Sequence, residues 1–338
     1  MTHRITDYRD LLFGVRTVPV YAKLPSVEPG SMQPIPGKMA VVNCIDNSVI
    51  SVVSKGYQLV PNTDALRYAR QCCEAAFPDL PSSEWEVSGA DAPKSCGHCH
   101  IDLQHNTAKL DFSAVAAKEK PDTYGPYIRV TNSYNQTRAL RFEIGFMRKV
   151  CSNGLVLPES SVRFALTHNT RRIPERLKFH ISQPGFENIR GQFQQFLRPL
   201  RDCRIPRARF APIASAALQI RKPRTRSGRA EETWFQLQWN LERLCDKYVV
   251  ELGETAYALL NVITDVASRP LDVGLKGRER SSLQRRAGVW LADFSKECRK
   301  ADFHLDRYVE KCRVAVKPSA DPVTQPAWGG SSHGLPRM

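Results

Sequence analysis

Residues 139–150, Ala-Leu-Arg-Phe-Glu-Ile-Gly-Phe-Met-Arg-Lys-Val, alternate between apolar and polar side chains. Successive side chains of an extended strand point to opposite faces, so the apolar residues share one face and the polar residues share the other. The apolar face comprises Leu140, Phe142, Ile144 and Phe146, and the opposite face comprises Arg141, Glu143 and Gly145. The segment therefore predicts a strand of an antiparallel sheet with one face buried.

Similar strand patterns occur on both sides of this segment. They cover residues 39–44, 48–54, 85–90, 99–104, 109–115 and 126–131. The turn residues 45–47 separate the first two and predict a hairpin. Between Asn62 and Phe77 the apolar residues recur at helical spacing, and Asn62 or Thr63 is suited to cap that helix. These patterns predict an α+β fold, with an antiparallel or mixed sheet packed by helices.

The chain after Pro158 has a helical pattern. Apolar residues at three- and four-residue steps predict a helix near residues 189–197 and an amphipathic helix over 234–263. A further helix is expected from Ser281, which forms a capping-box pattern with Gln284, to about residue 308. The last two helices are expected to form a C-terminal helical hairpin whose aromatic side chains belong to the core.

Changes in composition divide the chain into five parts. Residues 1–37 are rich in proline and predict an extended N-terminal arm, and residues 38–197 predict a sheet-rich α+β domain. Residues 198–230 predict a basic linker or loop, and residues 231–315 predict a C-terminal helical region. Residues 316–338 are rich in Pro, Ser and Gly and predict a disordered tail.

The composition indicates a basic globular protein. The 338 residues carry a formal net charge of +15, and the hydrophobic content of 42% is typical of chains that fold around a core. The sequence contains no apolar run long enough for a transmembrane helix and no secretory signal pattern. We therefore expect a cytoplasmic protein with its ten cysteines as thiols and no membrane partner, and its oligomeric state is left open.

The positive charge is concentrated between Arg198 and Arg229. Ten cations lie there, and Asp202 is the only acid, so this stretch carries +9 of the net +15. The cations are Arg198, Arg201, Arg204, Arg207, Arg209, Arg221, Lys222, Arg224, Arg226 and Arg229. The planar guanidinium group of arginine matches the geometry of a phosphate. The stretch therefore predicts a nucleic-acid-binding element, and a solvated loop without a partner is the alternative.

A short cluster of cysteine and histidine is the one candidate for a metal site. Cys96-Gly-His-Cys-His matches the c-type haem pattern, but haem attachment normally occurs outside the cytoplasm, where this chain is not expected. Zinc held by Cys96, Cys99, His100 and His105 is the better functional interpretation, although a second pair at defined spacing is missing. We predict no cofactor and no metal, with zinc as the alternative to a chance cluster on a strand end.

Four motifs resemble a phage/plasmid-like family of prokaryotic proteins of unknown function. The motifs begin at Lys55 (Lys-Gly-Tyr-Gln-Leu-Val-Pro-Asn-Thr-Asp-Ala), Arg129 (Arg-Val-Thr-Asn-Ser-Tyr), Gly145 (Gly-Phe-Met-Arg-Lys-Val-Cys-Ser-Asn-Gly-Leu) and Thr167 (Thr-His-Asn-Thr). The resemblance covers about residues 39–176 and implies a mixed sheet packed by helices. It also implies a shared set of polar residues at Tyr57, Asn62, Asn132, Arg148, Cys151, Asn153 and His168.

The sequence thus predicts a nucleic-acid-binding protein of a phage, prophage or plasmid, acting in recombination or replication. Single-stranded DNA is the favoured partner, because Tyr124, Tyr127 and Tyr134 are available for base stacking near Arg129. An enzyme that uses the polar set on a phosphorylated or nucleotide-like substrate is one alternative, and a host-interaction protein is another. The sequence contains no Walker loop, dinucleotide-binding turn or nucleophile elbow, which argues against common enzyme classes.

Overall fold

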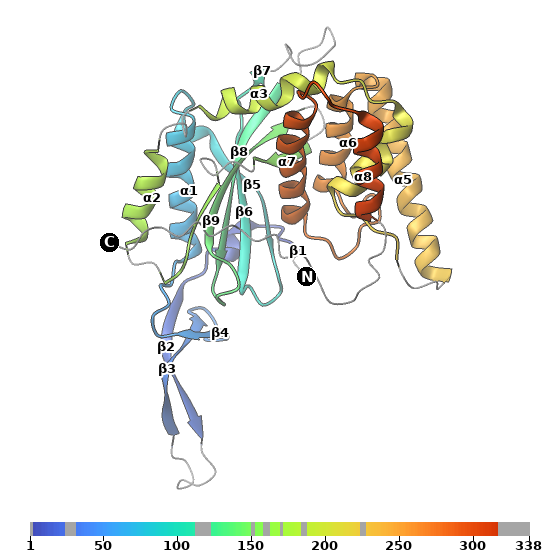
Figure 1. The fold of residues 1–338 in the computed structure, drawn as a ribbon. Coiled ribbons are helices and arrows are strands. Elements are labelled where there is room, and N and C mark those ends of the chain that lie inside the picture. The colour runs from blue at the N-terminus through green and yellow to red at the C-terminus, as the bar shows by residue number, and fades with distance from the viewer. Residues whose placement is uncertain are drawn as a thin grey trace.

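The computed structural model describes residues 3–23, 32–111, 123–149, 153–157, 163–169, 172–183, 188–223 and 228–316. A twisted sheet stands between two layers of helices, and a narrow β-hairpin projects from one end of this body (Figure 1). The fold is α+β with C-terminal helices, as the sequence predicts. The residues that we predicted as a tail lie outside the described range from residue 317 onward.

The main sheet consists of antiparallel pairs in the order β1-β5-β6-β8-β9-β10, with β7 beside β8 and β11 beside β9. The strands are β1 (His3–Arg4), β5 (Trp85–Ala92), β6 (His98–His105), β7 (Leu110–Asp111), β8 (Thr123–Ser133), β9 (Leu140–Arg148), β10 (Asn153–Val156) and β11 (Arg163–Leu166). Residues 139–150, whose alternation predicted a strand, contain β9, which lies between β8 and β10. Its alternating pattern therefore marks a central strand.

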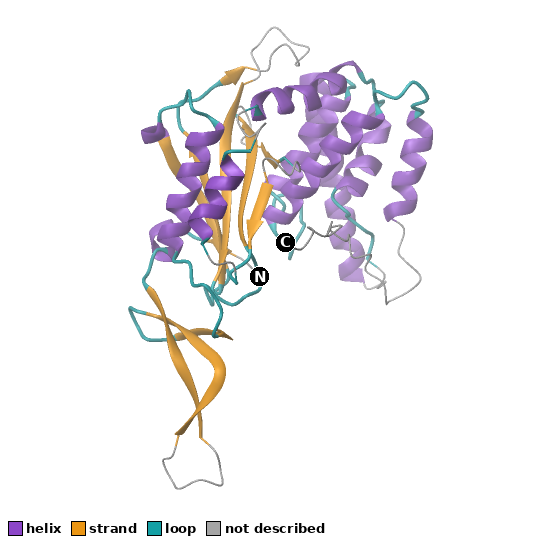
Figure 2. Cartoon of the chain, turned by 60° about the vertical axis from the view of Figure 1, so that its left-hand side comes forward, coloured by secondary structure: helices purple, strands orange, loops and turns teal. Residues whose placement is uncertain are grey.

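One face of the sheet packs against α1 (Asn62–Ala76), α2 (Ile173–Ile181) and α3 (Ile189–Asp202). Phe142 and Phe146 of β9 are fully buried on this face, and the Phe146 ring stacks on Phe193 of α3 at 4.3 Å between centroids. Figure 2 shows α1 and α2 standing in front of the sheet and the other helices beyond it. The apolar face of β9 thus forms the core that its alternation predicts.

The opposite face of the sheet is also buried, which corrects the prediction of a single buried face. Helices α6 (Ala256–Ser268) and α7 (Arg280–Glu297) cover it, and Glu143 on that face is 0% exposed. Gly288 of α7 rests directly on β10, because a Cβ there would lie 1.7 Å from the carbonyl oxygen of Val156. Only glycine allows the helix to approach this closely.

The C-terminal region contains more helices than the predicted hairpin. Its helices are α4 (Phe210–Ala217), α5 (Gly228–Leu252), α6, α7 and α8 (Leu305–Val316). The expected single helix over 234–263 is broken at Gly253, whose φ is +77°, and Thr255 caps the start of α6 through the Ala258 amide. The expected capping box is also wrong, because Glu279 occupies the N-cap position of α7 and Ser281 is buried inside the helix.

Residues 198–223 are mostly helical, where we expected a linker or loop. They form the end of α3, the short 3-10 helix η3 (Arg207–Arg209) and α4. Phe210, Ile213 and Leu218 between the arginines are fully buried in the core. This apolar set anchors the basic stretch to the helical layer.

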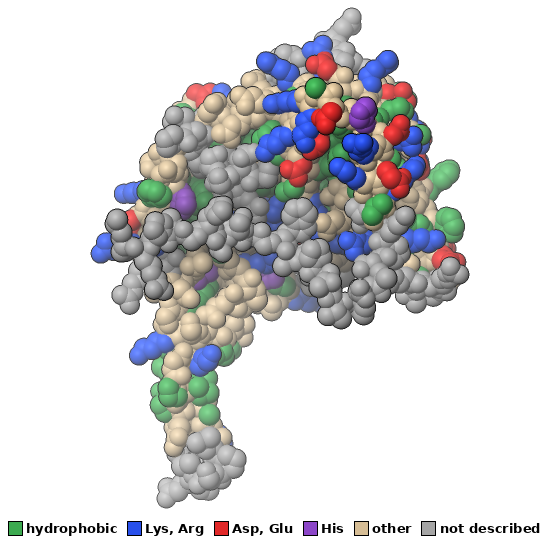
Figure 3. All heavy atoms as spheres, in the orientation of Figure 1, with side chains coloured by type: hydrophobic (Ala, Val, Ile, Leu, Met, Phe, Trp, Pro, Cys, Tyr) green, Lys and Arg blue, Asp and Glu red, His purple; other side chains and the backbone are tan. Residues whose placement is uncertain are grey.

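The N-terminal arm is a projecting hairpin of β2 (Val15–Lys23) and β3 (Met32–Asn43), to which β4 (Val49–Ser54) adds a third strand near the body. The hairpin predicted around residues 45–47 is the β3–β4 turn. The described residues of β2 and β3 include Arg16, Lys23 and Lys38 and no acid. Figure 3 accordingly shows basic and hydrophobic side chains along the arm and no acidic ones. Two further short helices are η1 (Tyr8–Leu11) and η2 (Ser82–Glu84).

Candidate functional site

The ten cations of the basic stretch have different environments. Arg207 pairs with Glu242 and Asp246 of α5, and Arg209 pairs with Asp306 of α8. Six others are exposed: Arg198, Arg201, Arg204, Arg221, Lys222 and Arg229. Arg224 and Arg226 lie outside the described residues. Two of the cations therefore hold helices together, and the exposed ones are accessible to a partner.

Arg221 belongs to a group of three arginines, which we call the arginine cluster. Arg286 of α7 donates from Nη1 to the Leu218 carbonyl at 2.9 Å, and Arg278 donates from Nη2 to the adjacent Gln219 carbonyl at 3.2 Å. Two consecutive carbonyls at the end of α4 thus hold two guanidinium groups side by side. Arg221 follows two residues later in the chain, and its charge acts on Arg286.

Arg286 is partly buried beside two other positive charges. Burial lowers the pKa of Arg286, and the positive charges of Arg278 and Arg221 lower that pKa further. None of the three forms an ion pair with an acidic side chain in the part of the chain that the structure describes. No local pattern predicts the cluster, because Arg278 and Arg286 lie 59 and 68 residues from the carbonyls that hold them.

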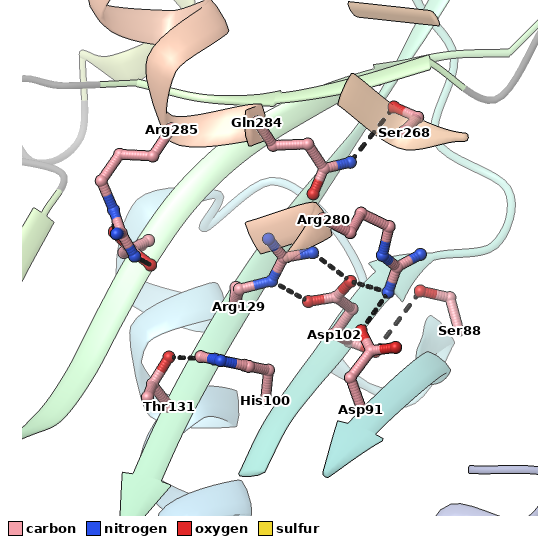
Figure 4. Close-up of polar contacts among 11 residues, drawn as sticks. Ser88, Asp91, His100, Asp102, Arg129, Thr131, Ser268, Arg280, Gln284 and Arg285 are labelled. Carbon is pink, nitrogen blue, oxygen red and sulfur yellow. Dashed lines mark hydrogen bonds and ion pairs between the residues drawn. The ribbon is translucent and has the colours of Figure 1, made fainter. Parts of the chain in front are cut away.

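A second constellation, the buried charge network, lies between the sheet and α7 (Figure 4). Asp102, Arg129 and Glu143 are cross-strand neighbours on β6, β8 and β9. Arg129 donates from Nε and Nη2 to the two carboxylate oxygens of Asp102, each at 2.7 Å. From α7, Arg280 reaches Asp102 at 3.2 Å, and Arg285 binds Glu143 through two hydrogen bonds of 2.8 and 3.0 Å.

The arginines around Asp102 and Glu143 lower the pKa of each carboxyl group, which favours its ionised form. Burial alone raises the pKa of Asp102, but the charge and hydrogen bonds of Arg129, aided by Arg280, bring that pKa below its usual value. For Glu143, burial is likewise outweighed by the hydrogen bonds and charge of Arg285, and its pKa is lowered. With Asp91, which Arg280 also binds at 2.8 Å, three carboxylates face three guanidinium groups. The network therefore fastens α7 to the sheet.

His100 lies beside the network on the same face of β6 as Asp102. Burial, and after it the charge of Arg129, lowers the pKa of His100 well below its usual value, so the imidazole is neutral. Its Nδ1 lies 2.7 Å from Thr131 Oγ1, and its buried Nε2 has no hydrogen-bond partner among the described residues. Among the described residues, no third group binds Nε2 to orient the ring as the acid of a catalytic triad does.

The tyrosines that we expected to stack on bases are inaccessible, which corrects that prediction. Tyr124, Tyr127 and Tyr134 are at most 3% exposed. Arg129, near which they were expected to act, is 1% exposed and binds Asp102 through Nε and Nη2. The central strands of the sheet therefore offer no stacking surface.

The polar set implied by the resemblance divides into two groups. Tyr57, Asn62, Asn132 and His168 gather where α1 begins. Asn132 donates to the Val60 carbonyl and to Asn62 Oδ1, each at 2.8 Å, and the Tyr57 ring stacks on His168 at 4.7 Å between centroids. These four side chains are buried, and their contacts hold the chain before α1 against β8.

Two other members of the set, Arg148 and Asn153, lie at the far end of the sheet. Arg148 ends β9 opposite Tyr124 and pairs with Glu251 of α5 at 2.8 Å, and Asn153 begins the adjoining strand. Asn132 lies eight positions after Tyr124 along β8, a span of about 26 Å. Cys151 lies outside the described residues. Arg148 and His168 are thus not brought together, and the enzyme alternative has no common site there.

The four candidate zinc ligands do not converge. Cys99 points toward α1, where its Sγ donates to Asn62 Oδ1, whereas His100 occupies the opposite face of β6. His105 accepts a hydrogen bond from the Ala108 amide at 3.0 Å, and Cys96 is half-buried in the turn before β6. No group of three or more metal-ligating side chains is present across the described ranges. The alternation of the strand separates ligands that are adjacent in sequence.

Comparison with known proteins gives one match. No curated protein and no solved structure matches the chain. Within the described residues, no helix combines the length and apolar character needed to span a bilayer. The model of a domain of unknown function, DUF932, matches residues 49–288, which include β4 to β11, the basic stretch, the arginine cluster and the buried charge network. The match covers well over half of the sequence, so the chain belongs to the DUF932 family.

Proposed function

We propose that this protein binds nucleic acid through the arginine cluster and the exposed cations beside it. The observation that carries the proposal is the gathering of Arg221, Arg278 and Arg286 without an acidic partner in the described chain. Like charges repel, and a phosphate placed among them relieves the repulsion and accepts bidentate hydrogen bonds. Lys222 next to Arg221 extends the positive surface.

Three other features support the same partner. The net charge of +15 favours association with a polyanion. The projecting arm contains cations and no acid along its described residues, and β-ribbons are among the elements that enter nucleic-acid grooves. The resemblance to phage- and plasmid-borne proteins supports a role in recombination or replication of a mobile element, with single-stranded DNA as the favoured ligand.

The proposal predicts that removing local charge weakens binding. The double variant R221A/K222A removes two exposed cations and should lower the affinity for a fluorescently labelled DNA strand about tenfold, or ~1.4 kcal/mol. The log–log dependence of affinity on salt should become shallower by about 1.4, because each lost phosphate contact accounts for roughly 0.7 on single strands. Fluorescence anisotropy at several salt concentrations measures both quantities.

A matched control removes the same charge elsewhere. The double variant R9A/R67A also loses two exposed arginines, one in η1 and one on α1. Its affinity should stay within about twofold of the unaltered protein, since only local contacts act strongly at physiological salt. Equal losses in the two variants would show that net charge alone governs binding, and the arginine cluster would not be the site.

A further inference from the structure

Two cysteines that are distant in the sequence meet where α3 and α7 end. Cys203 is the C-cap residue of α3, and Cys298 is the C-cap residue of α7. The Sγ atom of Cys298 lies 4.0 Å from the carbonyl oxygen of Pro199, which is four positions before Cys203. Figure 1 shows α3 crossing above the end of α7. Both thiols are free and half-buried, so a small reagent can reach them. We call these two residues the thiol pair.

A second contact holds the end of α7 against the same side of α3. Arg299, the residue after Cys298, donates from Nη2 to the Gln195 carbonyl. Gln195, Pro199 and Cys203 follow one another at four-residue steps, so they lie along one side of α3. Contacts at two successive turns of α3 therefore fix the position of Cys298 relative to Cys203.

The two thiols share a hydrogen bond that makes them chemically unequal. Cys203 donates to Cys298, which lowers the pKa of Cys298 and raises the pKa of Cys203. The charge of Arg299 also lowers the pKa of Cys298, against the effect of burial. By contrast, burial raises the pKa of Cys72 and of Cys99. Because the thiolate is the reactive form of cysteine, Cys298 is the nucleophile of the thiol pair.

We propose that the thiol pair is a reversible oxidation site, which a peroxide converts to a disulfide. The Cys298 thiolate attacks hydrogen peroxide, takes up one proton, and becomes a sulfenic acid with release of water. Cys203 then attacks that sulfur, which forms the S–S bond and releases a second water. The two sulfurs lose two electrons, which reduce the peroxide, and a dithiol reductant reverses the reaction by thiol–disulfide exchange.

The disulfide would connect the two helical layers. Helix α3 packs on one face of the sheet and α7 on the other, and the thiol pair lies where their ends meet. A cross-link that closes a long loop restricts the unfolded chain. The oxidised protein should therefore unfold at a temperature about 5 °C higher than the reduced protein, as measured by circular dichroism.

Mass spectrometry of the full chain tests the thiol pair directly. The protein is reduced, freed of reductant and treated with a small excess of hydrogen peroxide. Iodoacetamide should then label two fewer cysteines than in the reduced protein. Trypsin should release residues 202–204 linked to residues 297–299, because Arg and Lys flank both cysteines, and dithiothreitol should separate the two peptides.

Single variants separate the roles of the two thiols. In C203S the sulfenic acid of Cys298 lacks its partner, so dimedone should label Cys298 in this variant more than in the unaltered protein. In C298S the nucleophile is absent, and Cys203 should remain open to iodoacetamide after peroxide. The matched control is C44S, which removes an exposed cysteine between β3 and β4 and should form the disulfide normally. Circular dichroism checks that each variant keeps its helices.

Three results would overturn the proposal. The first is the absence of the link between residues 202–204 and 297–299 in the peroxide-treated unaltered protein. The second is dimedone labelling of Cys298 that is no greater in C203S than in the unaltered protein. The third is an equal rise in unfolding temperature when C203S is oxidised, because that rise would come from another modification.

Discussion

Arg129 carries its positive charge in the protein interior, where burying a charged group costs free energy. It is 1% exposed, and Asp102 neutralises it through two hydrogen bonds, with Arg280 completing the arrangement from α7. A buried pair adds little net stability relative to apolar residues, but removing one partner leaves an uncompensated charge. The pair therefore acts as a specific connection between β6, β8 and α7.

Asp102→Asn should destabilise the protein by about 3–5 kcal/mol, because Arg129 keeps its charge and loses its partner. Urea unfolding measures the loss. The matched surface variant Asp64→Asn removes a carboxylate from the exposed Arg67 pair and should cost less than about 1 kcal/mol. Similar losses in the two variants would contradict the assigned burial of the network.

The same residue should give the protein a pH-dependent stability. The folded-state pKa of Asp102 is lowered, so its contribution is fully present above the unfolded value of about 4 and is lost as the pH falls through the folded value. Asp102→Asn should accordingly flatten the decline in unfolding free energy below about pH 4. An identical acid decline in both proteins would show that Asp102 does not contribute to it.

The sequence predicted only part of the buried charge network. Alternation along β6 and β9 places Asp102 and Glu143 on the polar face, but that face was interpreted as open to solvent. The residues that close it, Arg280 and Arg285, are separated from the carboxylates they bind by 178 and 142 positions. Nothing in a local pattern indicates such a pairing. The arginine cluster was missed for the same reason.

Helices and strands were predicted correctly where the apolar residues followed a clear two-residue or helical spacing. The strands β5, β6, β8 and β9 and the helix α1 lie close to their predicted bounds. The basic stretch was misjudged because Pro199 and Pro206 and the many arginines obscure the apolar residues that form α4. Gly253 could have predicted the break between α5 and α6, because glycine commonly ends helices at this position.

The contact of α7 with β10 depends on the absence of a side chain at Gly288. Gly288→Ala should destabilise the protein by about 3 kcal/mol, because its Cβ would overlap the Val156 carbonyl and force α7 away from the sheet. Thermal or urea unfolding measures this. Gly228→Ala is the matched control, since no atom lies within 4 Å of its Cβ and alanine favours helix, so its stability should not fall. A tolerated Gly288→Ala would refute the close approach.

At the scale of the whole molecule, positive charge is distributed over separate surfaces. The hairpin of β2 and β3 is acid-free along its described residues, and the arginine cluster connects α4 with α7. The acids of the helical layer are largely engaged by arginines such as Arg207 and Arg148. This distribution leaves cations accessible at the surface, and it is the physical basis of the proposed binding.

The salt dependence of DNA binding tests this account most directly. The affinity of the unaltered protein for a labelled single strand is measured by anisotropy across a series of salt concentrations. Three phosphate contacts at the arginine cluster predict a linear log–log plot in which affinity falls with a slope of at least about 2. Absence of binding at low salt, or an affinity that does not change with salt, would contradict the proposal that this protein binds nucleic acid.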